Sequence, residues 1–278
     1  MKITLFLLLE VKSMYNLISA DLYKISRSTA IKILFLITTI SSVIMAILAY
    51  EIPKGNISSS MTGIGFMFSD MDVLSILGAA LAGILICGDF DNKVIHDAIA
   101  CGNSRWTVIV SKAAVFSCAL TFILLPYVIV TAIGIGTGYR FSMGSVSIGF
   151  LNLLTTDGGT ALTGSGIGKL IIVSLTLIIV YAAQLSLCIP LAIVLKKPAL
   201  VVPIYYGGSI LFAQLILLAK NYKLFGDIFA CTPYGGKHSF VTLASGSGDI
   251  FKAILVSLIF IAVMLIITHF AFRKSEIK

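Results

Sequence analysis

Apolar and polar residues follow one another in long blocks along the chain, and the apolar blocks have the length of membrane-spanning helices. A helix needs about 20 apolar residues to cross the hydrocarbon of a bilayer. Six blocks reach or approach this length, and the second is short: residues 30–50, 73–87, 113–138, 170–195, 199–219 and 253–272. The pattern predicts an all-α membrane protein with six transmembrane helices, in a single transmembrane domain of residues 1–278.

The longest helix-like polar stretch between two of these blocks is residues 88–105. Its positions separate at helical spacing into an apolar stripe and an opposite polar face: Val94, Ile95, Ala98 and Ile99 against Asn92, Lys93, His96 and Asp97. Asp89 or Asp91 is placed to cap the start of such a helix, and Gly102 is placed as the glycine that follows its end. We expect a short, capped amphipathic helix that makes a contact.

Residues 14–28 form a second amphipathic pattern. Apolar and polar positions again alternate with the period of a helix: Tyr15, Ile18, Leu22 and Ile25 against Asn16, Asp21, Lys24 and Arg27. The pattern favours a helix on the membrane surface, with its basic side chains toward lipid headgroups. An ordinary cytosolic helix is the alternative.

Residues 1–13 resemble a weak signal sequence, with Lys2 followed by an apolar run. Glu10 interrupts this run, and no small-residue cleavage site follows. We expect either an upstream-extended reading frame, with Met14 as the better start, or a short extra turn of helix.

Composition supports a bilayer as the environment. The 278 residues are 58% hydrophobic and only 12% charged, whereas soluble domains carry about 25% charged residues. Of the 20 basic residues, 13 lie in four segments: residues 2–32, 93–112, 196–197 and 273–278. Basic residues concentrate on the cytoplasmic side, so we expect both termini and residues 88–105 to be cytoplasmic. No basic patch with interleaved aromatics indicates nucleic-acid binding.

The two larger segments expected on the outer side are residues 139–169 and 220–252. Both are rich in Gly, Ser and Thr. The second mixes such turn residues with apolar pieces. Short helices that dip back into the outer leaflet would explain this mixture, and a plain flexible loop would explain it equally well.

Candidate chemistry is sparse. The five cysteines form no CxxC pair and the three histidines have no ligand spacing, so we expect no metal or redox site. Residues 163–170, TGSGIGKL, resemble a phosphate-binding loop, but Thr163 replaces its first glycine and Leu170 replaces its hydroxyl residue. We expect no catalytic residues and no nucleotide site in this chain.

A few polar residues lie inside the apolar blocks and are candidates to line a cavity: Thr121, Tyr181, Gln184 and Gln214. Ionisable residues are expected only at the ends of the blocks, as with Asp70, Asp72, Asp89 and Asp91. Because intramembrane ionisable groups mark ion paths, their absence at mid-depth disfavours a proton-coupled carrier that works alone.

Three stretches of the chain resemble the type-2 ABC-transporter permeases. They are ISADLYKISRS at 18–28, CGDFDNKVIHDAIACGNSRWTVIVSK at 87–112, and the fifth and sixth apolar blocks with the apolar loop between them. The second stretch resembles the order of features in this family. An acidic residue follows span two, then come a short helix and a Gly-x-Ser-Arg turn, and a lysine opens span three. The chain is most similar to small six-span exporter permeases, including those of lantibiotic and antimicrobial-peptide immunity. The first 13 residues have no counterpart in this pattern.

This resemblance implies an elbow helix at 14–28 and a coupling helix at 89–105 that docks on an ATPase. The ATPase-coupling residues would be Asp89, Asp91, Asn92, Lys93, His96, Asp97, Gly102, Ser104 and Arg105. It also implies an assembly of two ABC ATPase subunits with two permeases, the second permease being an identical or a related copy. ATP and Mg would be bound by the ATPase, and this chain would bind no cofactor.

The resemblance further implies export of an amphipathic peptide, drug or lipid-like substrate across the bacterial cytoplasmic membrane, with membrane lipid around the chain. A membrane scaffold or assembly protein that transports nothing is the first alternative. An intramembrane enzyme is the second.

Overall fold

The computed structural model describes residues 2–143, 147–159, 164–235 and 238–274, and every regular element in these ranges is a helix. The elements are α1 (Lys2–Arg27), α2 (Thr29–Glu51), η1 (Ser59–Met61), α3 (Thr62–Met67), α4 (Asp70–Ala82), the π-helix η2 (Gly83–Cys87), α5 (Gly88–Asp91), α6 (Val94–Ala100), α7 (Arg105–Gly136), α8 (Gly149–Asp157), α9 (Gly164–Leu185), α10 (Cys188–Leu195), α11 (Pro198–Asn221), α12 (Lys223–Phe229), η3 (His238–Phe240) and α13 (Ser247–Lys274).

Five helical segments are long and apolar enough to cross a membrane, within the part of the chain that the structure describes. They are Thr29–Glu51, Thr62–Asp91, Arg105–Gly136, Gly166–Leu195 and Ser247–Lys274. The all-α prediction is therefore confirmed for the described residues. The expected fifth span lies in α11, where the apolar part found is shorter, Pro198–Phe212. A sixth crossing stays a prediction.

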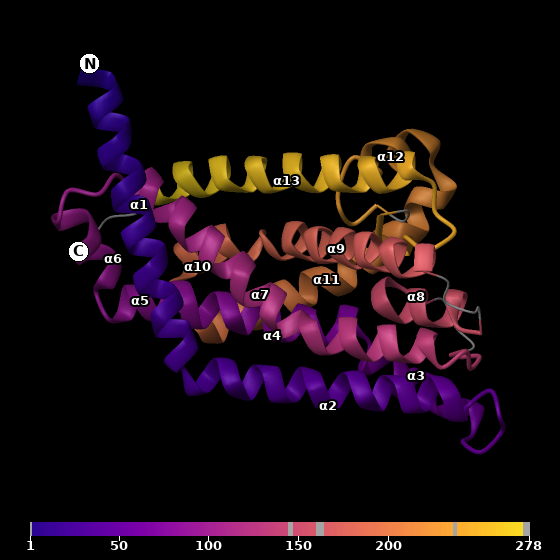
Figure 1. Ribbon diagram of the computed structural model, residues 1–278. Coiled ribbons are helices and arrows are strands. Elements are labelled where there is room, and N and C mark those ends of the chain that lie inside the picture. Colours follow the sequence, from indigo (N-terminus) through magenta and orange to yellow (C-terminus); the bar gives the residue numbers. More distant parts are fainter. Residues whose placement is uncertain (1, 144–146, 160–163, 236–237, 275–278) are drawn as a thin grey trace.

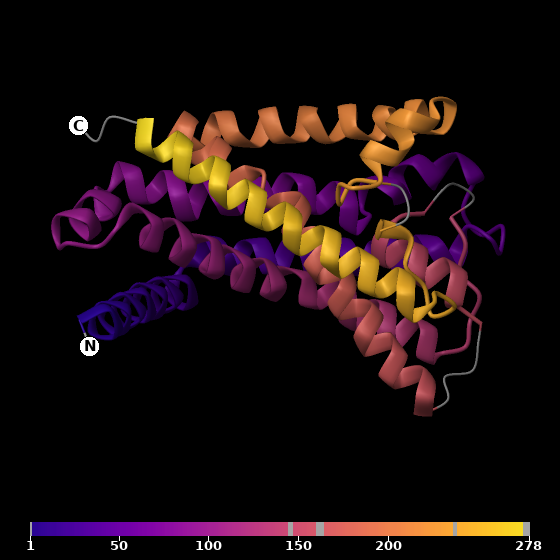
Figure 2. The same cartoon turned by 90° about the horizontal axis from the view of Figure 1, so that it is seen from above.

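The long helices lie side by side, and α1 lies across one end of the bundle (Figures 1 and 2). The same end holds α5, α6 and the end of α13, so the start of α1 and the end of α13 lie near one end of the molecule. The opposite end holds α3, α8 and α12. Three helical regions that carry basic residues, α1, α6 with its flanking residues and the end of α13, thus lie at one end. No membrane is part of the structure, so the side of the bilayer stays a prediction.

The second apolar segment differs from the expectation in length. It is not a short block at 73–87, because α3, α4, η2 and α5 together extend from Thr62 to Asp91. This segment is the most buried of the five. As a result Asp70 and Asp72 lie within the apolar segment and not at its end, which corrects the expectation from sequence.

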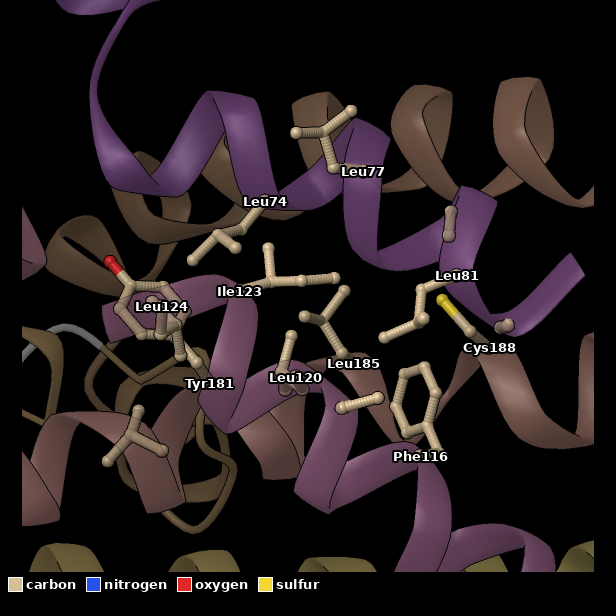
Figure 3. Packing of buried hydrophobic residues seen from close by; sticks show 14 of the residues in the cluster. Leu74, Leu77, Leu81, Phe116, Leu120, Ile123, Leu124, Tyr181, Leu185 and Cys188 are labelled. Atoms are coloured by element: carbon tan, nitrogen blue, oxygen red, sulfur yellow. The ribbon is translucent and has the colours of Figure 1, made fainter. Parts of the chain in front are cut away.

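Helix α4 buries both large and small residues, among them Leu74, Leu81, Gly78 and Ala79. Figure 3 shows Leu74 and Leu81 gathered with Leu120 and Ile123 of α7 and Leu185 of α9, and all five are buried. Small residues let membrane helices approach closely.

Two glycines of the second segment show such close approach. A methyl group on Gly78 would meet Leu185 Cδ1 at 2.6 Å, and one on Gly83 would meet Pro198 Cβ at 2.9 Å. The first contact brings α4 against the end of α9, and the second brings η2 against the start of α11.

The two loops of residues 139–169 and 220–252 contain short helices, α8 and α12. Helix α8 is held by Asp70, which is completely buried. The Asp70 carboxylate accepts hydrogen bonds from Phe150 N (2.7 Å), Leu151 N (3.3 Å) and the Tyr181 hydroxyl. It therefore satisfies backbone N–H groups at the start of α8, which have no partner within that helix.

Gly149, at the start of α8, provides a test of the contact between α8, Asp70 and Tyr181. Its φ is +63°, and a methyl group there would overlap the Tyr181 hydroxyl and the Asp70 carboxylate. We expect Gly149→Ala to lower the free energy of unfolding by about 2 kcal/mol or more, measured as a lower melting temperature in detergent. Gly168→Ala is the control, because nothing lies within 4 Å of that position in α9. Equal melting temperatures of the two variants would show that close packing of Gly149 against Asp70 and Tyr181 does not stabilise the fold.

Candidate functional site

The candidate site is the end of the bundle where residues 88–105 connect the second and third apolar segments. Helix α6 ends in a pair of backbone hydrogen bonds, Gly102 N to Ile99 O (2.9 Å) and Asn103 N to Ala98 O (3.3 Å). Gly102 has φ +90°. This is the Schellman motif, in which a left-handed glycine terminates a helix, and it confirms the expected role of Gly102.

The start of α6 differs from the expectation. Neither Asp89 nor Asp91 caps it, because both belong to α5, which continues the helix from η2. Lys93 is the residue before α6, with φ +58° and no side-chain cap. The carboxylates therefore lie at the end of one helix and not at the beginning of the next.

The apolar stripe of α6 faces the bundle for most of its length. Ile95 is buried, and Ala98 and Ile99 pack against the core. Val94 is exposed, in contrast to the prediction, and His96 is half-buried with its ring edge-on to Phe90. Three of the four stripe positions therefore anchor α6.

Asp89 is the centre of a cluster of four charges. Its carboxylate, 1% exposed, binds Lys24 of α1 through one oxygen and Lys112 of α7 through the other. Lys112 Nζ also binds both carboxylate oxygens of Asp21 of α1, at 2.8 and 2.6 Å. The two negative and two positive charges join α1, α5 and α7. We call Asp21, Lys24, Asp89 and Lys112 the ion cluster.

Arg105 connects the same end to α13. Its Nη1 donates to the carbonyl oxygens of Phe272 and Arg273, both at 3.1 Å. The last carbonyls of a helix lack intrahelical partners and favour a cation. Phe272 lies edge-on to Phe90 of α5 at 6.0 Å between ring centroids, and Lys196 Nζ lies 5.2 Å from the centroid of the Phe90 ring. Helices α5, α7 and α13 and the end of α10 are thus joined here.

The nine residues predicted for coupling fall into three groups in the structure. Asp89 is buried in the ion cluster, and Arg105 and His96 are half-buried and contact the bundle. Ser104 is exposed, but it caps α7 by accepting from Thr107 N at 3.1 Å. The others are exposed: Asp91, Asn92, Lys93, Asp97 and Gly102. We call Asp91, Asn92, Lys93 and Asp97 the exposed polar surface of the 91–97 segment.

Sequence reasoning placed Asp21 and Lys24 on a polar helix face and Lys112 at the start of a span, without pairing them. The sequence does contain a feature that indicates this pairing. Charged residues that flank apolar blocks need partners of opposite charge when they are buried. The contacts of Phe90 with Phe272 and Lys196 are not indicated by any feature of the sequence, since aromatic and basic residues are common at span ends.

The four polar candidates inside the apolar blocks separate into two places. Tyr181, Gln184 and Gln214 line one cavity of about 240 Å³ between α4, α9 and α11. Thr121 does not line it. Its hydroxyl donates to Ser117 O in its own helix, at 2.9 Å.

Comparison with protein-family models, curated proteins and solved structures found no match to this chain.

The ion cluster makes a measurable prediction for stability. Asp89→Ala leaves Lys24 without its carboxylate and leaves Lys112 with only Asp21. We expect a loss of about 2–3 kcal/mol in the free energy of unfolding, below the value for a fully buried pair because Lys24 is half exposed. Thermal unfolding in detergent measures it. Asp97→Ala, in the exposed polar surface, should change stability by less than about 0.5 kcal/mol, and equal effects of the two variants would show that the cluster is dispensable.

Proposed function

We propose that this chain is the membrane-spanning permease subunit of an ATP-driven ABC exporter, energised by a separate ATPase subunit. The observation that carries the proposal is the exposed polar surface of the 91–97 segment, which extends from the end of α5 into α6 and is joined to two long apolar segments. A contact made at Asp91, Asn92, Lys93 or Asp97 acts on a segment held at both ends, by α5 on one side and by the Schellman turn and capped α7 on the other.

The surroundings of α6 support transmission of force. The ion cluster joins α5 to α7 and α1, and Arg105 joins the start of α7 to the end of α13. A displacement of α6 therefore acts on several helices together. Packed interiors respond to such displacements by shifts of whole elements.

The placement of α1 supports the same function. It lies across the end of the bundle (Figure 1), and Tyr15, Leu22 and Tyr23 are exposed on it. An exposed apolar face beside basic residues suits a membrane surface. We propose that residues 14–28 are the elbow helix and that this end of the bundle faces the cytoplasm.

In this proposal two ATPase subunits bind ATP and Mg and dock on two permeases, of which the second is an identical or a related chain. The substrate is an amphipathic peptide, drug or lipid-like molecule, and the complex lies in a bacterial cytoplasmic membrane. This chain contributes the path and the docking surface.

Purification of the full chain from its native membrane in mild detergent tests the partnership. We expect an ATPase with a phosphate-binding loop to co-purify in equal molar amount. A membrane scaffold has no need of an ATPase, so a stable complex that contains none would favour that alternative.

Charge reversal on the exposed polar surface tests coupling. We expect Asp91→Arg with Asp97→Arg to lower export and ATPase stimulation at least about tenfold, because reversed charges oppose a complementary docking surface. The melting temperature of the isolated chain should stay the same, because both side chains are exposed.

Asp249→Arg is the matched control for this variant. Asp249 is exposed in the first turn of α13, at the end of the bundle opposite α6. The Asp249→Arg variant should retain export and ATPase stimulation. Full export by the Asp91→Arg, Asp97→Arg variant in complex with the ATPase would overturn the proposed docking surface.

A further inference from the structure

The cavity between α4, α9 and α11 is lined by Asp72, whose carboxylate has no partner among the described residues. Its volume is about 240 Å³, slightly below the roughly 300–1,000 Å³ of pockets for drug-sized ligands. Asp72 is the only charged residue among the described residues that line it, and Leu74, Leu185, Tyr181, Tyr205 and Tyr234 are among the others.

Most polar groups that line the cavity are already satisfied by the protein. The hydroxyls of Tyr205 and Tyr234 both donate to Gln184 O, at 3.3 and 2.6 Å, and the Tyr181 hydroxyl donates to Asp70. Gln184 Nε2 donates to Pro233 O at 2.9 Å. These residues therefore offer the cavity mainly ring and hydrocarbon surface.

The serines of the cavity are also occupied. Ser75 Oγ donates to Asp72 O at 2.8 Å and Ser209 Oγ donates to Tyr206 O at 2.7 Å, each within its own helix. No hydrogen bond or ion pair reaches the Asp72 carboxylate from the described residues. Gln214 is exposed at the edge of the cavity.

Of the four carboxylates in the second apolar segment, Asp91 is exposed, and the other three show why Asp72 is unusual. Asp89 is neutralised by two lysines, and Asp70 accepts three hydrogen bonds. Asp72 is half-buried and has neither kind of partner among the described residues. A carboxylate in an apolar site is costly unless a cation or a donor meets it.

We propose that this cavity binds a small organic monocation, with its ammonium or amidinium head at the Asp72 carboxylate. Its apolar body lies among Leu74, Leu185 and the tyrosine rings. Aromatic rings and a carboxylate both attract a cation, and the rings attract it most when water is excluded. The small volume favours a molecule with one ring or a short branched chain. The proposal does not depend on the exporter function, because it concerns binding to this chain alone.

Binding of tritiated benzyltrimethylammonium to the purified full chain in detergent tests the proposal. We expect saturable binding in wild type. Neopentylbenzene, in which carbon replaces the charged nitrogen, should compete at least about tenfold more weakly, since it loses the ion-pair and cation–π attraction of the charged head. This comparison uses the unaltered protein, so it decides the question even if a variant fails to fold.

Asp72→Asn keeps the shape of the side chain and removes its charge. We expect its affinity for the cation to fall at least about tenfold, with an unchanged melting temperature. Asp249→Asn, an exposed acid at the same end of the bundle, should bind as wild type does. Equal affinity of Asp72→Asn and wild type, equal competition by neopentylbenzene, or no saturable binding at millimolar concentration would each overturn the proposal. None of these results bears on co-purification with an ATPase.

Discussion

The buried carboxylate of Asp89, paired with Lys24 and Lys112, is the interaction on which the organisation of one end of the bundle depends. Moving a charge out of water costs several kcal/mol unless partners of good geometry replace the water. Here the partners lie 65 and 23 residues away in sequence, and Asp21 completes the charge balance. The cluster tolerates little relative movement of α1, α5 and α7, because any separation leaves a buried charge unpaired.

Helix α6 takes its position from this constraint. Two residues separate it from α5 and four separate it from α7, so its attachment points are the two elements that Asp89 and Lys112 join. Arg105 then extends the connection to the end of α13. A segment as short as α6 would not be stable alone. Its order comes from Ile95 in the core and from the Schellman turn at Gly102.

The local sequence pattern predicts a structural feature correctly where neighbouring residues determine that feature. The apolar blocks predicted α2 and α13 with modest errors at their ends, and Gly102 predicted the end of α6. Pattern failed where the determinant was distant in sequence. The local pattern predicts Asp89 as a helix cap because nothing nearby in the sequence shows its pairing with α1. The pattern predicts Asp70 and Asp72 outside the second span because charged residues usually end an apolar block, and the backbone N–H groups that accommodate Asp70 lie about 80 residues away.

The segment from Thr62 to Asp91 links the two proposed sites physically. Asp72 lies about a third of the way along it and Asp89 lies near its end, roughly 25 Å apart at helical rise, and the π-helix η2 lies between them. A π-helix is a rare, strained turn that often occurs at functional positions. Gly78 and Gly83 hold this segment in close contact with Leu185 and Pro198. Asp72 and Asp89 thus belong to one continuous helical stretch formed by α4, η2 and α5, and a displacement of this stretch along its axis moves both residues.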